Sequence, residues 1–333
     1  MPWTGLEEEE SSSQAAPRAA SRFRWLLKPN FHLQMAYATA AILLISFFGC
    51  KATQTTVPNA SSVALVSAFV LVALLPLPLY LREKKRLHWL NIPMTLVWAV
   101  VFSYLLFYPV TVAGRLSIPF ELQDAHFVRL DQHLGVYVPA ISQWALTNWL
   151  GLIINRAYPI LIPFMKLAVL IPALCGRVKD AQRYLIANII AFAIGLPLFA
   201  LFPAVGPWYG YHIPARVDQA GCEALVMLIR QPGPYVFQPP AGLICFPSFH
   251  VIWAVLCAHA VWGFRWLRIP AALVSTAIIF STMTTGVHYF CDVLGGLLVA
   301  LLAVLAANWV SARSGVSVRR PESPGILRGI WWS

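Results

Sequence analysis

Long apolar stretches separated by short polar ones run through most of the chain. A helix needs about 20 predominantly apolar residues to cross a bilayer. Eight stretches come near or exceed that length, at about residues 31–49, 62–81, 92–113, 150–174, 184–203, 247–264, 269–285 and 287–310. The pattern therefore predicts an all-α, polytopic integral membrane helical bundle with about eight transmembrane spans.

The composition favours the same class of protein. Hydrophobic residues make up 59% of the chain and charged residues only 11%, which is far from the average for soluble domains. The formal net charge of +11 would suit nucleic-acid binding, but the basic residues sit mainly in short loops between the predicted spans. No arginine-rich patch with interleaved aromatic residues accompanies them. We therefore expect membrane lipid, and no nucleic acid, as the partner.

Three polar stretches lie between or beside the spans. Residues 1–28 carry an acidic run and predict a disordered tail, because a signal peptide would begin with a basic segment. Residues 115–149 mix charged residues with Trp and Pro, which predicts one or two interfacial helices, with Asp124 to His133 as a solvated face. Residues 204–245 are rich in Gly and Pro and predict a long polar loop.

The basic residues also predict an orientation, because cytoplasmic loops carry an excess of Lys and Arg. A cytoplasmic N-terminus places 17 of the 24 basic residues on the inner side and only five on the outer side. Both termini are then cytoplasmic. The end of the fifth span and the starts of the sixth and eighth spans share the outer face.

Two histidines and one aspartate fall at that outer face. Asp292 is the only one of the thirteen acidic residues inside a predicted span, where a carboxylate is costly unless it has a partner. His288 lies four positions earlier, one helical turn away. A carboxylate so placed fixes the imidazole tautomer, which prepares a histidine to act as a nucleophile or a base. The charge pattern places His250 at the same depth.

The residues around these three side chains resemble a known family. Pro247, Ser248 and His250, followed by the His288-x-x-x-Asp292 pattern, are similar to the second and third motifs of the type 2 phosphatidic acid phosphatase superfamily. The longer sequences around these motifs, FPSFH and GVHYFCD, most resemble the inositolphosphotransferase-like branch of this superfamily. That branch includes fungal inositol phosphorylceramide synthases and many bacterial membrane proteins. The resemblance implies a bacterial inner-membrane enzyme whose active site lies on the extracytoplasmic face.

The resemblance also implies a division of the chain. Its motif-bearing part covers about residues 201–298, and a similar helical layout extends back to about residue 90. We therefore expect a disordered cytoplasmic tail over 1–28, two extra transmembrane helices over 29–89, a six-helix core over 90–311 and a cytoplasmic tail over 312–333.

The implied chemistry is phosphoryl transfer through a phosphohistidine. His288 would attack phosphorus, Asp292 would orient it, and His250 would protonate the leaving alcohol and then activate the next nucleophile. Ser248 would donate a hydrogen bond to a phosphoryl oxygen, although it would equally serve as a helix cap. The implied reaction uses a membrane lipid phosphate as substrate, inositol or another alcohol or water as acceptor, and neither metal nor cofactor.

The chain departs from the phosphatase motifs where these carry cations. Gly195 and Phe202 stand at the lysine and arginine positions of the first motif, and Thr282 stands at the arginine position of the third. Phe249 replaces the usual glycine of the second motif. These departures favour the transferase-like branch over a plain phosphatase.

Further candidate substrate-binding residues lie near the same face. Arg156, in the fourth span, is our candidate replacement cation. Pro203, Gly206 and Pro207, which follow the fifth span, complete the candidate set.

Other interpretations remain open. A plain lipid phosphatase, acting on phosphatidic acid or a polyprenyl diphosphate, uses the same motifs. A non-catalytic lipid transporter would also bury ionisable groups, though at broken helices near the midplane. A zinc hydrolase could employ two histidines and an aspartate. Finally, Cys222 and Cys245 are the cysteine pair of the long outer loop, where a disulfide could form.

Overall fold

The computed structural model describes residues 30–58, 90–239 and 242–313. The predicted N-terminal tail, 1–28, and the predicted second span, 62–81, lie outside the described residues, as does the predicted C-terminal tail from residue 314 onward. The described part is mostly helical, with connecting turns and loops, and it contains two strands of two residues each. These strands, β1 (Thr55–Thr56) and β2 (Tyr235–Val236), pair in parallel.

The apolar stretches form the long helices that the sequence predicts. Their bounds are α2 (Phe31–Ala52), α5 (Asn91–Leu105) with α6 (Phe107–Leu116), α9 (Trp149–Asn155) with α10 (Leu161–Leu174), α11 (Val178–Leu201), α14 (Phe249–Val261), α15 (Arg268–Thr284) and α16 (Phe290–Arg313). Within the described residues, six helical segments are long and apolar enough to span a membrane. The fold class is therefore an all-α membrane bundle.

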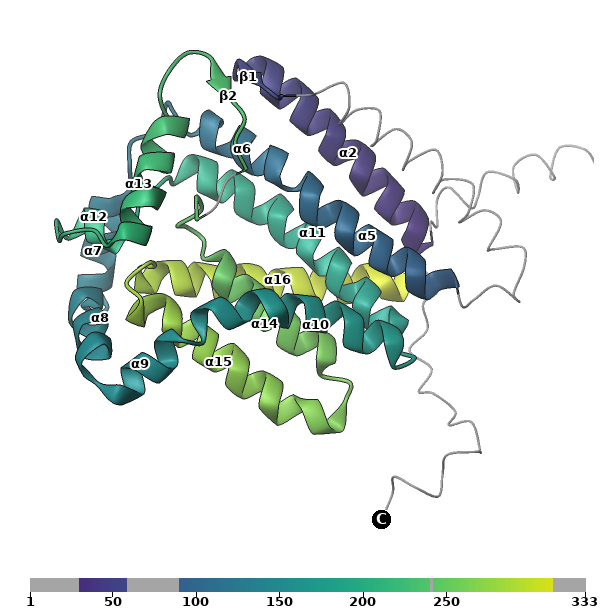
Figure 1. Cartoon of the computed structure of the whole chain (residues 1–333). Helices are drawn as coiled ribbons and strands as arrows, with labels where there is room; N and C mark the ends of the chain where they lie inside the picture. The colour runs from purple at the N-terminus through teal and green to yellow at the C-terminus, as the bar shows by residue number, and fades with distance from the viewer. Residues whose placement is uncertain (1–29, 59–89, 240–241, 314–333) are drawn as a thin grey trace, which may run out of the picture.

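The predicted sixth span is shorter in the structure than the sequence suggests. The apolar stretch 247–264 forms only the 13-residue helix α14, which is shorter than a typical membrane span. Pro247 and Ser248 precede the helix, and the chain turns again at Trp262. Helix α14 is nevertheless central to the bundle, because it contacts α10, α11, α15 and α16 (Figure 1).

The fourth predicted span is interrupted near the candidate site. Helix α9 ends at Asn155, a 3₁₀ turn (η2, Tyr158–Ile160) follows, and α10 continues from Leu161. Pro159 lies inside that turn, and proline has no N–H for a helical hydrogen bond. The interruption presents Tyr158 to helix α14.

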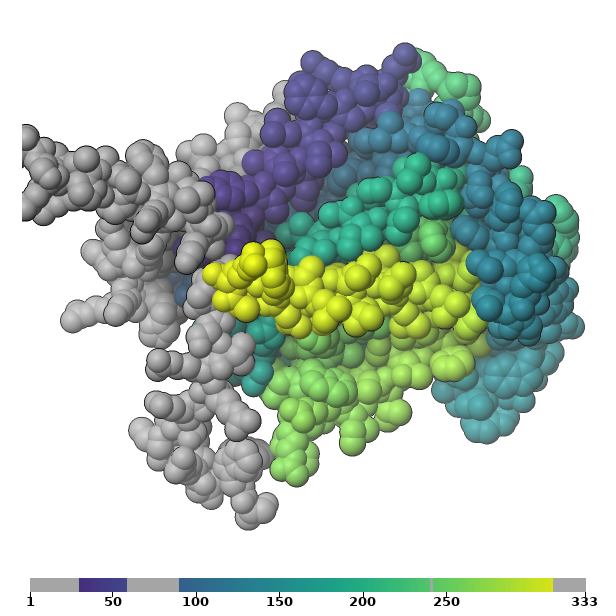
Figure 2. All heavy atoms as spheres, turned by 180° about the vertical axis from the view of Figure 1, so that it is seen from behind, coloured from purple at the N-terminus to yellow at the C-terminus, as the bar shows by residue number. Residues whose placement is uncertain are grey.

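Small residues let α16 approach its neighbours closely. Ala300, Ala303 and Ala307 are fully buried, and Gly296 faces the start of α14. A Cβ at Gly296 would lie 2.7 Å from the carbonyl oxygen of Ser248, so only glycine permits this contact. On its other side α16 exposes Leu294, Leu298, Leu301 and Leu305, as a lipid-facing helix would. Figure 2 shows α16, in yellow, running across the surface of the molecule.

Short helices gather at one end of the bundle, beside the starts of α14 and α16 (Figure 1). They are α7 (Asp124–His133), α8 (Val138–Thr147), α12 (Pro207–Gly210) and α13 (Val217–Ile229). Two of them, α7 and α8, lie between 115 and 149, where the sequence predicts one or two helices. The other two correct the prediction of a plain loop over 204–245. Helix α13 is capped by Gln219, whose side chain accepts from the Arg216 N–H at 2.9 Å, and the sequence lacks the usual Ser, Thr, Asp or Asn signal there.

Two arginines hold the C-terminal part of α13 against the bundle. Arg115 is buried and donates hydrogen bonds to the carbonyl oxygens of Thr53, Ile229, Gln231 and Gly233. Arg230 donates to the carbonyl and hydroxyl oxygens of Ser117 at 2.6 and 2.7 Å. These bonds join α13 to the ends of α2 and α6, which lie far away in the sequence.

Candidate active site

The two motif segments meet through the main chain. The Ser248 N–H donates to the carbonyl oxygen of Asp292 at 3.2 Å, which joins the start of α14 to the first turn of α16. Ser248 is fully buried, and its Oγ accepts from the Val251 N–H at 3.4 Å as a helix cap. The capping role therefore exists, and the hydroxyl hydrogen remains available to donate elsewhere.

His288 and Asp292 form the pair that their spacing predicts. Nδ1 of His288 lies 3.4 Å from Oδ2 of Asp292 and 3.0 Å from the carbonyl oxygen of Cys245. Because both partners only accept hydrogen bonds, we assign the proton to Nδ1 and the free lone pair to Nε2. Both side chains are buried. The imidazole is thus held in the tautomer that a nucleophile needs.

Asp292 also fixes the start of its own helix. Its Oδ2 accepts from the Tyr289 N–H at 2.8 Å and from the Cys245 thiol at 3.1 Å. The contact to Tyr289 is the backward half of a capping box, three residues into the helix. One carboxylate therefore links the first turn of α16, the loop before α14 and the imidazole of His288.

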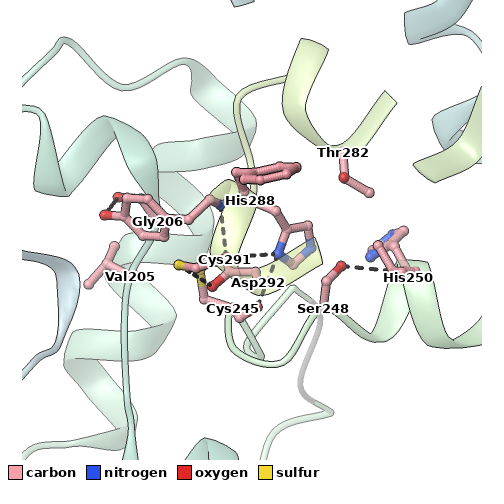
Figure 3. A network of polar contacts seen from close by, with 12 residues as sticks. Val205, Gly206, Cys245, Ser248, His250, Thr282, His288, Cys291 and Asp292 are labelled. Carbon is pink, nitrogen blue, oxygen red and sulfur yellow. Dashed lines mark hydrogen bonds and ion pairs between the residues drawn. The ribbon is translucent and has the colours of Figure 1, made fainter. Parts of the chain in front are cut away.

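His250 faces His288 across the site. The two ring centroids are 5.7 Å apart, and Figure 3 shows His288, Ser248 and His250 directed toward a common region. The ring of Tyr158 stacks on His250 at 4.2 Å, with its hydroxyl 3.5 Å from Nδ1. A residue from the interrupted fourth span therefore holds the candidate acid–base group, and no sequence pattern indicates this contact.

Helix α7 supplies two buried carboxylates, which corrects the prediction of a solvated face. Asp131 accepts from the N–H groups of Phe290 and Cys291 at 2.8 and 2.9 Å, at the N-terminus of α16. Asp124 accepts from the N–H of Gly206 and from the hydroxyl of Tyr289, both at 2.9 Å. Both side chains are almost fully buried. Burial raises the pKa of each carboxyl above its usual range, and the hydrogen bonds that each accepts oppose that rise.

A pattern in α7 was available to indicate this burial. Asp124, Phe127 and Asp131 are spaced three and four residues apart, on one helix face, and all three are buried. His126, Arg129 and His133 are exposed, so only the other face is solvated.

The segment that follows α11 packs against this hydrogen-bond network of α7 and α16. It contains the candidates Pro203, Gly206 and Pro207. The Gly206 carbonyl accepts from the Tyr289 hydroxyl at 2.8 Å, and Gly206 has a φ of 150° that disfavours other residues. A Cβ there would lie 2.4 Å from the Trp208 ring. The Pro203 carbonyl accepts from the Gln123 N–H at 2.8 Å, and Pro207 opens α12. All three candidates are buried and contact the segments that support His288 and Asp292.

Gly195, Phe202 and Thr282, which stand where the phosphatase motifs carry lysine or arginine, make other contacts in this structure. Gly195 faces the ring of Phe249, which a Cβ would approach to 2.8 Å. Phe202 is exposed and packs edge-to-face with Phe246. Thr282 is buried, and its carbonyl oxygen accepts from the N–H of His288 at 3.2 Å, so this position shapes the turn before His288 through its main chain.

A different arginine contacts the turn that carries His288. Arg156 is exposed at the end of α9. Arg216 donates through Nη2 to the carbonyl oxygen of Thr285, and Gln219 reaches the carbonyl oxygen of Gly286 at 3.3 Å. The sequence did not single out Arg216, because it lies in the region predicted as a loop.

The predicted cysteine pair is not joined. Cys222 and Cys245 are both free thiols. The Cys245 thiol is directed at Asp292 instead, while Cys222 lies beside Gly242. The ligand-type atoms of Cys245, His288 and Asp292 all lie within 4.8 Å of one another, so they are also a cluster that could hold a metal ion.

The comparisons with known proteins agree with this geometry. A family model described as the PAP2 superfamily matches residues 125–306, which is more than half of the 333 residues. The match includes His250, His288 and Asp292. Comparisons with curated proteins and with solved structures gave no significant match.

Proposed function

Because the chain belongs to the PAP2 superfamily, we propose that it cleaves a membrane lipid phosphoester through a phosphohistidine and passes the phosphorylated group to an alcohol. Membership in this superfamily supports the coarser part, a phosphatase-type reaction on a lipid phosphoester. The finer part, transfer as in the inositolphosphotransferase-like branch, rests on the site. The observation that carries the phosphohistidine reaction is the buried His288–Asp292 pair, 3.4 Å apart, with the His250 ring 5.7 Å from that of His288. The transfer itself is supported by the positions that lack a cation.

In the first step Nε2 of His288 attacks phosphorus, and the bond from phosphorus to the leaving oxygen breaks. His250 donates a proton to that oxygen as the lipid alcohol departs. The imidazole of His288 becomes positively charged when it is bonded to phosphorus, and the carboxylate of Asp292 at Nδ1 stabilises this charge. The Ser248 hydroxyl and the N-terminus of α14 provide donors for phosphoryl oxygens.

In the second step the acceptor attacks the phosphohistidine. His250, now neutral, takes the proton of the incoming hydroxyl, and the bond from phosphorus to Nε2 breaks. An alcohol such as inositol gives a new phosphodiester, whereas water gives hydrolysis. The same two histidines thus serve both halves of the reaction.

The missing cations support transfer of a phosphodiester. A phosphomonoester dianion requires more positive charge than a phosphodiester, which carries only one negative charge. The matching positions hold Gly195, packed against Phe249, Phe202, packed against Phe246, and the buried Thr282. Aromatic side chains line this part of the structure, and exclusion of water would favour an alcohol acceptor over hydrolysis.

Arg216 supports the second candidate, a plain lipid phosphatase. Its guanidinium contacts the turn three residues before His288 and would supply part of the charge that a dianion requires. In that case phosphatidic acid or a polyprenyl diphosphate would be the substrate, and water the acceptor.

One experiment separates the two candidates. Purified protein in detergent would be incubated with a panel of phosphodiester and phosphomonoester lipids, with and without inositol, and the products identified by mass spectrometry. We expect inositol-containing products from a phosphodiester lipid. Release of free phosphate from monoester lipids at rates unaffected by added alcohols would decide for the phosphatase. His288→Ala in the same assay identifies any product that does not come from this site.

A further inference from the structure

We propose that Cys245, His288 and Asp292 form a binding site for a thiophilic divalent cation such as Zn²⁺, and that the bound cation switches the enzyme off. The three side chains are buried together, and their ligand-type atoms lie within 4.8 Å of one another. Thiolate, imidazole and carboxylate are the ligand types that zinc takes in proteins. The implied family chemistry gives Cys245 no role.

Two of the three distances between the ligand atoms are close to those of a zinc site, and the third lies within 4.8 Å. Tetrahedral zinc, with bonds of about 2.0–2.3 Å, places neighbouring ligand atoms roughly 3.3–3.8 Å apart. Nδ1 of His288 lies 3.4 Å from Oδ2 of Asp292, and the Cys245 sulfur lies 3.1 Å from the same oxygen. The sulfur must therefore move outward by a few tenths of an ångström, and one coordination position stays open for water.

The charges also suit a buried site. A Cys245 thiolate and the Asp292 carboxylate balance the two positive charges of the cation, so no net charge is buried. Binding converts the thiol to a thiolate and moves the Nδ1 proton of His288 to Nε2, while the imidazole remains neutral. One proton is thus released for each cation bound, and binding weakens as the pH falls.

The chemical consequence concerns the nucleophile. A neutral imidazole has one lone pair, and a cation at Nδ1 takes it. Nε2 then carries the proton and cannot attack phosphorus. The cation also occupies the Asp292 oxygen that orients His288. This inhibition, though not the binding itself, rests on the proposed role of His288.

Cobalt(II) tests the binding directly, because a thiolate ligand gives a charge-transfer absorption band that oxygen and nitrogen ligands lack. Co²⁺ would be titrated into the purified full-length protein in detergent. We expect one equivalent with a thiolate band that Zn²⁺ displaces. Cys245→Ser keeps a hydroxyl donor for Asp292 and should lose the band and bind Co²⁺ at least about tenfold more weakly, since even supporting contacts of metal ligands are worth that much.

Cys291→Ala is the matched control. Its sulfur is buried 4.0 Å from the other oxygen of Asp292, outside the ligand set, so the variant should keep the band. A wild-type protein without the band, or a band that survives in Cys245→Ser, overturns the site. Size-exclusion elution of both variants at the wild-type position shows that the loss is not one of folding.

Activity separates this inference from the proposed function. Saturating Zn²⁺ should lower turnover at least tenfold in the wild type and in Cys291→Ala, and Cys245→Ser should need at least tenfold more Zn²⁺ for the same fractional loss. If the protein binds no cation, the inference is wrong, while the His288→Ala test of the proposed function still stands. Binding without inhibition overturns the switch and argues against His288 as the nucleophile. Activity that is lost on chelation and restored by Zn²⁺ overturns both.

Discussion

At the scale of single residues, the carboxylate of Asp292 serves several parts of the site. It caps the start of α16 through the Tyr289 N–H and lies 3.4 Å from Nδ1 of His288. In the proposed mechanism its role is therefore one of orientation and charge, whereas His288 itself forms the bond to phosphorus. Variants of the two residues should differ accordingly.

His288→Ala should abolish turnover and leave the protein folded and membrane-inserted, because no other described group replaces Nε2. Asp292→Asn should lose less, since its amide oxygen can still accept a hydrogen bond. His250→Ala should lose about 10²–10⁴-fold, the usual value of acid–base assistance. Turnover of purified variants on the best substrate from the panel measures all three. Full activity in His288→Ala would rule out the mechanism.

Tyr158 should act through His250. Tyr158→Phe keeps the ring that stacks on His250 and removes the hydroxyl 3.5 Å from Nδ1. One neutral hydrogen bond is worth about 0.5–1.5 kcal/mol, so turnover should fall by at most about tenfold. Tyr158→Ala also removes the stacking and should lose more. The pH–rate profile is the discriminating readout, because an altered His250 environment shifts one of its limbs. Profiles identical to the wild type in both variants would contradict the role.

At the scale of elements, α7 stabilises the catalytic turn from outside the spans. Asp131 accepts two N–H groups at the start of α16, and Asp124 holds Tyr289 and Gly206. An amphipathic helix that resembles an interfacial element thus supports the helix that carries Asp292.

Asp131→Ala should destabilise the fold by about 2–4 kcal/mol, because two buried N–H groups lose a charged acceptor. The midpoint of thermal unfolding in detergent measures the loss. Asp131→Asn retains one acceptor oxygen and is the matched control, with a smaller expected loss. Equal stability of the alanine variant and the wild type would mean that α7 does not support α16.

The same pair of variants predicts a dependence on pH. Burial raises the pKa of Asp131, so the folded state holds this proton more tightly than the unfolded state. The stability of the wild type relative to Asp131→Asn is therefore greatest below the ordinary carboxyl pKa of about 4 and declines as the pH rises above it. Thermal midpoints of the two proteins, compared across that range, test the sign. A relative stability that rises with pH would contradict it.

Helices and residue pairs could be predicted from the sequence where a single local pattern determines them. Long apolar runs located α2, α11 and α16, and the His288–Asp292 spacing placed both groups on one turn. Helix α13 was missed because Gln219 caps it. The burial of Asp124 and Asp131 was missed although their helical spacing with Phe127 indicates one buried face. Their hydrogen-bond partners lie 81 to 165 residues away along the chain. The support of the site depends on such distant contacts, and no local pattern encodes them.

At the scale of the whole molecule, the candidate site lies at one end of the bundle, under the short helices (Figure 1). Cys175 is exposed in the turn between α10 and α11, at the other end. The distribution of Lys and Arg predicts that the site end faces outward and that the Cys175 end faces the cytoplasm.

Thiol labelling tests this orientation. Cys222 is a partly buried free thiol on the same helix, so it is first replaced by serine. Val217, at the start of α13, is 94% exposed, so Val217→Cys in a Cys175→Ser, Cys222→Ser background should react with a membrane-impermeant thiol reagent in intact cells. The native Cys175 should react only after permeabilisation, which makes each position the control for the other. The opposite pattern would reverse the predicted topology and place the site on the cytoplasmic side.

The contact between α7 and α16 has a consequence for biosynthesis. Asp131 is synthesised 159 residues before Phe290, whose N–H donates a hydrogen bond to its carboxylate. The carboxylate therefore lacks this partner while α10, α11, α14 and α15 are synthesised. Only the arrival of α16, the last described helix, brings in His288 and Asp292 and completes the hydrogen bonds of α7 at the same time. A chain that stops short of α16 is therefore left both without its candidate nucleophile and with the buried carboxylate of Asp131 lacking its two N–H partners, which is a defect that quality-control proteases are able to recognise.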